Sequence, residues 1–228
     1  MNNFKTWPLG DLPDKFQRPE IEWLKRQGYS FNDYYDIVEI FEQKVAKFAG
    51  SQYAVAVDSC TNGLFLCLKY SQAQGTITIP TRTYVSLPMQ ILHAGCQVAF
   101  EEIAWSGIYQ LKPYNIWDGA TRWRQNMYQD GLHVVSFQIK KRIPIGRGGM
   151  ILTDDYEAYK WLKQASHDGR NLKLTHNLDN VEMLGWHYYM TPEDAARGIL
   201  LMDQTPLINN DSSTDQSYND LSTLAVFK

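Results

Sequence analysis

The sequence has few cysteines, no long apolar run and no excess of charge of one sign. Its three cysteines (Cys60, Cys67 and Cys96) form no CxxC pair and fit no metal-ligand spacing, so no metal site is expected. Cys67 falls within an apolar helical pattern, which predicts a buried free thiol, and a reduced cytoplasmic setting is the default. The N-terminus lacks the apolar run of a secretory signal, and no stretch is long enough to span a bilayer. A net charge of -3 gives no sign of the basic surface that a nucleic-acid partner requires.

The residues that are present are typical of a soluble globular chain. The 228 residues suffice for one large domain, or for one domain with an appendage. Hydrophobic residues make up 44% and charged residues 21%, which argues against wholesale disorder. The densest basic stretch, Lys140 to Arg142 with Arg147 nearby, is short and suits small phosphate groups as well as solvent.

Helical and strand patterns alternate along the chain. Helices are expected over Glu20–Gln27, Asp33–Phe48, about Thr61–Leu68, Val85–His93, Asp155–Ser166 and Thr191–Met202. Strands are expected over Tyr53–Val57, Thr76–Ile79, Gln97–Phe100, Tyr114–Trp117, His133–Phe137 and Met150–Thr153. This alternation predicts a layered α/β domain with a largely parallel sheet, in which ligands bind where strands end and helices begin. The polar stretch from Asn209 to Ser222 is expected to be a surface tail or loop.

Two strand ends carry polar or aromatic residues at the start of the next helix. Asp58-Ser59-Cys60-Thr61 places hydroxyl and free N–H groups at a helix N-terminus, which suits a phosphate group, although such residues are more often ordinary helix caps. Tyr84 follows the strand that Pro80 ends and suits stacking on a flat heteroaromatic ligand; simple core packing is the alternative.

Two further strand ends carry charge. Asp118 follows apolar residues, and a buried carboxylate needs a cationic partner such as a protonated pyridine nitrogen; a turn or cap aspartate is the alternative. The strand ending at Ser136 leads to Lys140, Lys141 and Arg142. A lysine that forms a Schiff base needs a lowered pKa, which burial and neighbouring cations favour, while a solvated basic turn is the alternative.

Taken in order, these segments resemble the DegT/StrS family of pyridoxal-phosphate (PLP) sugar aminotransferases over roughly residues 20 to 204. The matching segments are Tyr53 to Thr61 (strand and Ser-Gly-Thr phosphate turn), Pro80 to Tyr84 (Pro-x-Phe-Thr-Phe/Tyr), Asp118 to Thr121 (Asp-Ala-Ala-Gln/His), Ser136 to Lys141 (Ser-Phe-His-x-x-Lys), Gly146 to Gly149 (Gly-Glu-Gly-Gly), and Gly185 to Thr191 (Gly-Tyr-Asn-x-Arg-Met-Thr/Ser) ahead of Ala195, Ala196 and Gly198. Each is short, but their order along the chain is specific.

The resemblance implies a role for each matched residue. It implies that Lys141 forms the internal aldimine with PLP and acts as the acid/base, and that Asp118 pairs with the pyridinium nitrogen. It further implies that Tyr84 stacks on the ring, that Thr121 lies beside the cofactor, that His187 reaches the phosphate of the other subunit in a homodimer, and that the phosphate is held by Ser59, Cys60 (through its backbone), Thr61 and Ser136.

The implied reaction is amino transfer, with glutamate as the expected donor and a nucleotide-linked keto sugar as the acceptor. A lysine at position 141 also argues against the dehydratase branch of the family, which carries histidine there. The implied fold is a truncated, three-layer large domain of fold-type I, with a mostly parallel sheet, over residues 1–205. Residues 206–228 are expected to form a polar tail, and the small C-terminal domain of the family is expected to be absent.

The sequence also departs from the family pattern. Roughly one βαβ step is missing between Phe100 and Asp118, Arg147 replaces the usual glutamate and Arg142 the usual asparagine. These departures leave open an alternative function, that of a catalytically silent PLP-binding or regulatory remnant. A Rossmann-type nucleotide site at Gly146 to Gly149 is a third, weaker reading, because this segment precedes a strand instead of following one.

Overall fold

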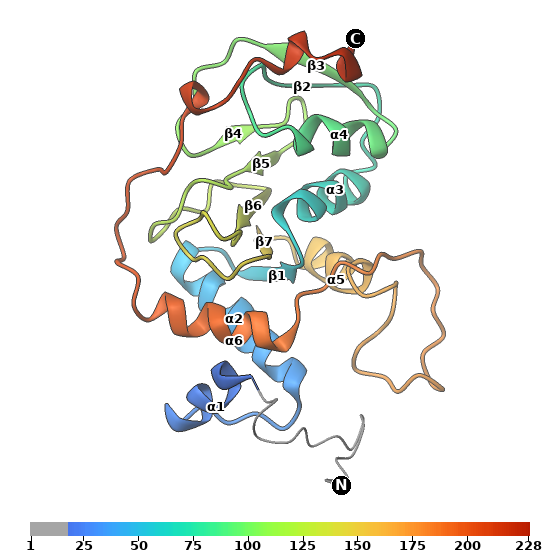
Figure 1. Ribbon diagram of the computed structural model, residues 1–228. Coiled ribbons are helices and arrows are strands. Elements are labelled where there is room, and N and C mark those ends of the chain that lie inside the picture. The colour runs from blue at the N-terminus through green and yellow to red at the C-terminus, as the bar shows by residue number, and fades with distance from the viewer. Residues whose placement is uncertain (1–17) are drawn as a thin grey trace, which may run out of the picture.

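The structure is a computed structural model that describes residues 18–228, and it has a central sheet with helices on both faces (Figure 1). The five strands of this sheet lie in the order β1 (Tyr53–Val57), β7 (Gly149–Thr153), β6 (Leu132–Ser136), β5 (Ile116–Asp118) and β4 (Tyr109–Gln110). A separate, parallel pair comprises β2 (Thr76–Pro80) and β3 (Gln97–Glu101). The predicted α/β class is confirmed.

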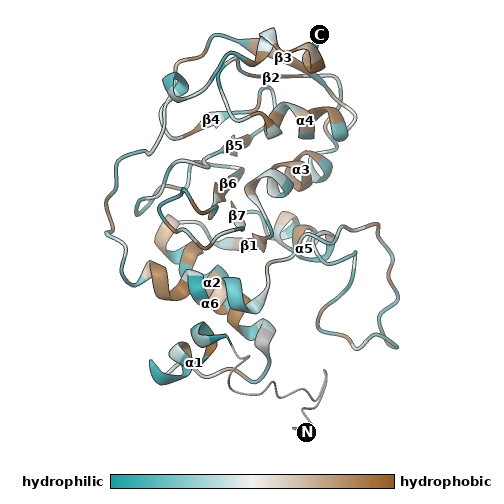
Figure 2. Ribbon diagram, viewed as in Figure 1, coloured by the Kyte–Doolittle hydropathy of each residue, from teal (hydrophilic) through white to brown (hydrophobic). Residues whose placement is uncertain are grey.

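Each face of the five-stranded sheet contributes to a hydrophobic core, and hydrophobic residues make up much of its central strands (Figure 2). In β1, Val55 and Val57 belong to the hydrophobic core on one face, whereas Ala54 and Ala56 belong to the core on the other. Because successive side chains of a strand point to opposite faces, such a strand needs a helical layer on each side. The chain therefore forms three layers.

The predicted helices are all present in the described part of the chain. One layer contains α3 (Cys60–Tyr70), α4 (Ser86–His93) and α5 (Tyr156–Ala165), and the other contains α1 (Pro19–Arg26), α2 (Tyr34–Ala49) and α6 (Pro192–Met202). The capping of α2 shows why these boundaries could be predicted. Asp33 accepts a hydrogen bond from the backbone N–H of Tyr35 at its start, and Gly50 ends it in the left-handed conformation at φ 86°.

The sheet is more mixed than the largely parallel sheet expected from the sequence. Strands β1, β5 and β6 point the same way, but β7 lies between β1 and β6 and is antiparallel to both, and β4 is antiparallel to β5. The turn between β6 and β7 reverses the chain instead of crossing over through a helix. As a result, Gly149 at the start of β7 lies beside the ends of its neighbours, paired with Val57 on one side and Ser136 on the other.

The segment expected to be a polar tail packs against the rest of the molecule. From α6 it runs along the sheet toward β3 (Figure 1) and contains three short 3₁₀ turns, η2 (Asp215–Ser217), η3 (Leu221–Thr223) and η4 (Ala225–Phe227). Asp211 forms an ion pair with Arg122 at 2.8 Å. Leu221 is buried, and its N–H donates to the carbonyl oxygen of Thr81 at 2.9 Å. These contacts fix the segment at two points.

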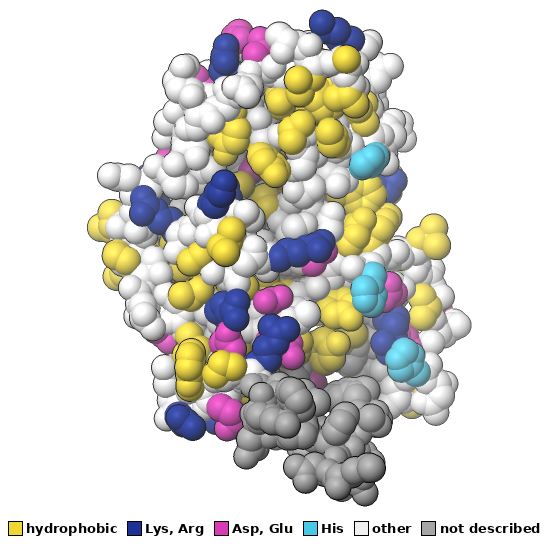
Figure 3. Space-filling model, viewed as in Figure 1, with side chains coloured by type: hydrophobic (Ala, Val, Ile, Leu, Met, Phe, Trp, Pro, Cys, Tyr) yellow, Lys and Arg dark blue, Asp and Glu magenta, His cyan; other side chains and the backbone are white. Residues whose placement is uncertain are grey.

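Other expectations concern the thiols and the surface. All three cysteines are buried and free, as predicted for Cys67. Within residues 18–228, no helix combines the length and apolar character needed to cross a membrane. On the face shown in Figure 3, basic and acidic side chains are interspersed instead of forming a band of one sign.

Candidate active site

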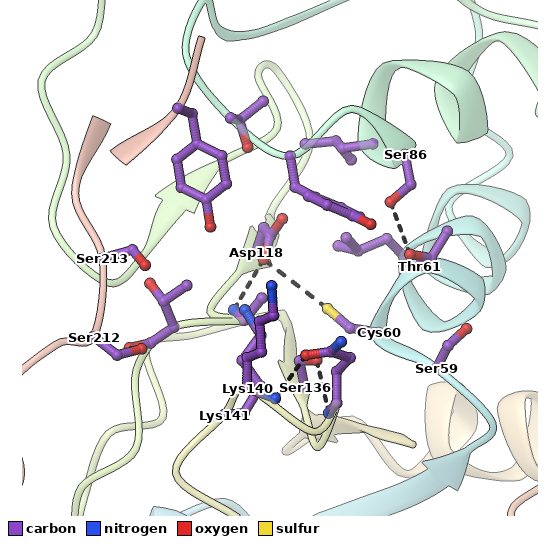
Figure 4. Close-up of a pocket in the computed structure, with 18 of the residues that line it drawn as sticks. Ser59, Cys60, Thr61, Ser86, Asp118, Ser136, Lys140, Lys141, Ser212 and Ser213 are labelled. Atoms are coloured by element: carbon purple, nitrogen blue, oxygen red, sulfur yellow. Dashed lines mark hydrogen bonds between the residues drawn. The ribbon is translucent and has the colours of Figure 1, made fainter. Parts of the chain in front are cut away.

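The carboxyl ends of β1, β5 and β6 meet at one edge of the sheet and surround a pocket of about 540 Å³ (Figure 4). All the predicted site residues except His187 line it, namely Ser59, Cys60, Thr61, Tyr84, Asp118, Thr121, Ser136 and Lys141. They come from four different connections between elements, so the fold brings together groups that are far apart in the sequence. This is the edge at which ligands bind in open α/β sheets.

The start of α3 forms one end of the pocket. Ser59 is the N-cap of this helix and its Oγ accepts a hydrogen bond from the N–H of Asn62 at 3.1 Å. The hydroxyl of Thr61 lies 2.8 Å from that of Ser86. A Cβ atom at Gly149 would lie 2.5 Å from the backbone nitrogen of Cys60, so glycine is what lets β7 approach the helix start. The partial positive charge and free N–H groups of a helix N-terminus suit an anion here.

Asp118, at the end of β5, is a buried carboxylate with two close donors. Its Oδ2 accepts the hydroxyl of Tyr109 at 2.6 Å, and its Oδ1 accepts the N–H of Ala120 at 2.9 Å. Burial raises the pKa of Asp118, while these hydrogen bonds and the charge of Lys141 lower it. A buried carboxylate with remaining acceptor capacity favours a cationic group beside it.

Lys141 lies in the turn after β6, where its N–H donates to the carbonyl oxygen of Gln138 at 2.8 Å. Its side chain is half-buried, and its charge lowers the pKa of both Asp118 and Cys60. Lys140 also lines the pocket, but its side chain is exposed. Lys141 is therefore the more buried of the two lysines in the pocket, and its charge acts on the buried carboxylate.

Thr121, Tyr84 and Ser136 complete the predicted set. The Oγ1 atom of Thr121 is buried in the pocket wall and makes no hydrogen bond within the described structure, and a ligand could satisfy such a group. The ring of Tyr84 is 62% exposed at the pocket, so one face is free to stack. The Oγ of Ser136 accepts a hydrogen bond from the N–H of Gln138 at 3.4 Å and retains its own proton for a ligand.

His187 is not brought to the pocket of its own chain. Its ring is exposed, and Nδ1 lies 2.9 Å from the carboxylate of Asp168. The backbone around it pairs with His167 in an isolated antiparallel bridge.

The pocket also contains residues that the sequence did not indicate. Tyr109 from β4 contacts Asp118, and the C-terminal segment contributes Ser212, Ser213, Ser217 and Tyr218 to the wall. Arg147, noted in the sequence as a departure from the family pattern, forms a 2.7 Å ion pair with Asp58 at the rim. A two-residue strand and a polar segment give little periodic signal, which is why Tyr109 and Tyr218 were missed.

A comparison with known families agrees with this geometry. The family described as the DegT/DnrJ/EryC1/StrS aminotransferase family matches residues 14–122 and 126–217, which is most of the chain. The chain belongs to this family. The family resemblance predicted from the sequence is therefore confirmed, and the match extends beyond residue 204 into the C-terminal segment. The aminotransferases of the DegT/DnrJ/EryC1/StrS family depend on PLP, so the predicted cofactor is confirmed at the level of the family.

Individual relatives show which part of the family architecture is present. AtS13 of Actinomadura melliaura has a TM-score of 0.66 at 17% identity, and the alignment covers 81% of this chain and 64% of that one. The sugar aminotransferase CalS13 of Micromonospora echinospora has a TM-score of 0.66 at 15% identity, with 82% and 64% covered. The spore coat polysaccharide biosynthesis protein SpsC of Bacillus subtilis is 41% identical over 69 residues, which are 29% of this chain and 18% of that protein. This DegT/DnrJ/EryC1/StrS member thus spans less than two thirds of the length of these relatives, as the truncated large domain predicts.

The residues present fit PLP. The start of α3 and its hydroxyl groups suit a phosphate at one end of the pocket, and buried Asp118 suits a protonated ring nitrogen. The unpaired hydroxyl of Thr121 and the open face of Tyr84 suit the polar edge and the flat face of the ring. Lys141 supplies a primary amine in the same pocket.

Proposed function

We propose that this protein is a PLP-dependent aminotransferase that transfers an amino group to a keto sugar, with Lys141 and Asp118 as its catalytic residues. One observation carries the proposal: a lysine, a buried carboxylate and the hydroxyl-rich start of a helix line one pocket of about 540 Å³. The sheet contributes these groups from the ends of different strands. If these groups had only structural roles, the lysine, the carboxylate and the hydroxyl groups would not need to line the same pocket.

Some side chains of the pocket would hold PLP, and Lys141 would take part in the reaction. PLP supplies an electron-withdrawing ring that makes the hydrogen on the substrate's amino-bearing carbon acidic. Ser59, Thr61 and Ser136 would hold the phosphate, and Asp118 would keep the ring nitrogen protonated. The Nζ of Lys141 would attach the cofactor and then remove the proton from the substrate carbon and return one. Tyr84 would limit the tilt of the ring by stacking on its face.

We assign the substrates by chemical class. Glutamate is the proposed donor, and a keto sugar, linked to a nucleotide, is the proposed acceptor. The family and its sugar aminotransferase relatives support this class. The wall contributed by Ser212, Ser213, Ser217 and Tyr218 supports it independently, because its hydroxyl groups can donate to and accept from a polyhydroxylated ring.

Trapping the cofactor tests the proposal. PLP added to the purified chain is expected to give a visible absorbance band, and borohydride reduction followed by peptide mass spectrometry is expected to place the pyridoxyl group on Lys141. The same experiment without borohydride is the control for adventitious mass shifts. Modification of Lys140 instead would overturn the lysine assignment, and the absence of any band would overturn the proposed function.

A catalytically silent PLP-binding remnant would pass the trapping test. It would fail to transfer an amino group from glutamate to any keto acceptor. Incubation of the loaded protein with glutamate alone separates the two, since the half reaction converts PLP to pyridoxamine phosphate without any sugar. Loss of the visible band on addition of glutamate supports the enzyme, and a stable band supports the remnant.

We further propose that the protein acts as a homodimer in which His187 of one copy reaches the phosphate end of the other pocket. The support is that His187 is exposed and lies outside the pocket of its own chain. Shared sites make a specific prediction for mixtures of Lys141→Met and His187→Ala, each of which is expected to be impaired alone. Mixed dimers then have one intact site, so an equal mixture is expected to regain up to about a quarter of the normal activity. A mixture no more active than its components, or a monomer by sedimentation, contradicts the shared site.

A further inference from the structure

Tyr109 is the closest side-chain donor to the carboxylate of Asp118, and it comes from the region where the sequence departs from the family. Strand β4 pairs with β5 so that Tyr109 lies directly opposite Asp118. Directly opposed residues of an antiparallel pair project to the same side of the sheet, which puts the tyrosine hydroxyl within reach of the carboxylate. The contact, between Tyr109 Oη and Asp118 Oδ2, is 2.6 Å.

The tyrosine is held on more than one side. It is 7% exposed, its ring lies 4.9 Å from that of Trp105, and the indole nitrogen of Trp105 donates to the carbonyl oxygen of Arg82 at 2.9 Å. The hydroxyl of Thr83 also contacts that of Tyr109. Because Tyr109 has a single hydroxyl proton and gives it to Asp118, Thr83 must be the donor in that contact.

The resulting order of donors runs from Thr83 to Tyr109 to Asp118. Burial and the neighbouring Asp118 raise the pKa of Tyr109, so its hydroxyl remains protonated and keeps donating. Successive hydrogen bonds of this kind strengthen one another in a buried site. This series of hydrogen bonds ends at the carboxylate of Asp118, and it stabilises the ionised form of that carboxylate against the cost of burial.

We propose that Tyr109 is the positioning residue for Asp118: it fixes the rotation of the carboxylate and keeps it ionised, so that Asp118 can pair with the protonated ring nitrogen of PLP. The role rests on the proposed function, because it concerns the same pocket. In this shortened chain, the β4–β5 pairing supplies the tyrosine hydroxyl from the region where the expected βαβ step is missing. Tyr109 acts through Asp118 and need not touch the cofactor.

The test is the variant Tyr109→Phe, compared with Tyr114→Phe as a matched control. Tyr114 lies in the same hairpin, and its hydroxyl is bonded to the backbone of Gln74, away from the pocket. Loss of a hydrogen bond to a charged group is expected to weaken PLP binding about tenfold in Tyr109→Phe. Tyr114→Phe is expected to bind PLP as the natural protein does. The readout is the dissociation constant from an absorbance titration with PLP, together with circular dichroism to show that both variants fold.

The pH dependence separates positioning from a merely structural role. Without the tyrosine donor the pKa of Asp118 rises further, so the carboxylate is neutralised at a higher pH during acidification. The pH at which PLP affinity begins to fall is therefore expected to move up by about one unit in Tyr109→Phe. Thr83→Val removes the donor to Tyr109 but leaves the tyrosine in place. It is expected to move the pH at which PLP affinity begins to fall in the same direction, but by a smaller amount. This second variant still tests the proposal if Tyr109→Phe folds poorly.

The outcomes distinguish this inference from the proposed function. If the natural protein does not bind PLP, the proposed function fails. If it binds PLP and Tyr109→Phe has the same affinity and the same pH profile, only the role of Tyr109 fails. Tighter binding by Tyr109→Phe would also overturn it, since Tyr109 would then compete with the cofactor for Asp118.

Discussion

Replacing Lys141 with methionine is expected to abolish amino transfer, with a fall in rate of about 10³-fold or more, because the proton at the substrate carbon loses its acid/base. Methionine keeps much of the length of the side chain, so the half-buried site stays filled. The measurement is the single-turnover loss of the visible band of the PLP-loaded protein after addition of glutamate.

The matched control for this variant is Lys140→Met, one residue earlier in the same turn. Lys140 is exposed, and its backbone N–H donates to the side chain of Gln138 at 2.8 Å. Lys140 also lines the pocket, but its side chain is exposed, so the substitution is expected to change the rate far less than Lys141→Met does. The opposite pattern, with Lys140→Met inactive and Lys141→Met active, would move the catalytic lysine by one position.

Replacing Asp118 with asparagine is expected to lower the rate about 10²-fold or more and to weaken PLP binding, because a buried cation loses the charge that pairs with it. Asparagine has nearly the same shape, and its amide oxygen can still accept from Tyr109, so the fold should persist. Its NH₂ group, however, would present donors where the site needs an acceptor. The rate and the dissociation constant for PLP are measured together.

Asp130→Asn serves as the control for Asp118→Asn. Asp130 is exposed and precedes Leu132 at the opposite end of β6, where its carboxylate accepts from Asn115 at 3.0 Å. The Asp130→Asn substitution is expected to leave the rate and the dissociation constant for PLP unchanged. An Asp118→Asn protein that retains full activity and affinity would show that the carboxylate does not pair with the ring and would leave the proposed mechanism without its electron sink.

Much of the site could be predicted because its signals are local. Asp118 ends one apolar strand, Lys141 lies in the turn after a second, and Ser59 follows a third, so short patterns placed them at strand ends. Strands that point the same way then bring their ends to one edge without any further information. Lys141 could be separated from Lys140 only by the family resemblance, and the structure adds the difference in their burial.

The parts that could not be predicted depend on contacts between distant segments. Tyr109 lies in a strand of two residues, and its importance comes from being opposite Asp118, a register that no local pattern records. The segment around Asp211 is polar, which suits solvent, but that carboxylate is 10% exposed because Arg122 neutralises it. The direction of β7 was likewise open, because the connection from β6 permits either a crossover or a reversal.

The wall formed by the C-terminal segment also affects the order in which the binding site is assembled during synthesis. Asp211 contacts a residue 89 positions earlier, and Tyr218 accepts a hydrogen bond from one 136 positions earlier. Contacts of such sequence separation close slowly compared with local ones. The groups between Ser59 and Lys141 therefore emerge from the ribosome well before the wall that will cover them. Because β7, which joins β1 to β6, is also made after Lys141, the pocket forms only once the later part of the chain has packed against the earlier part.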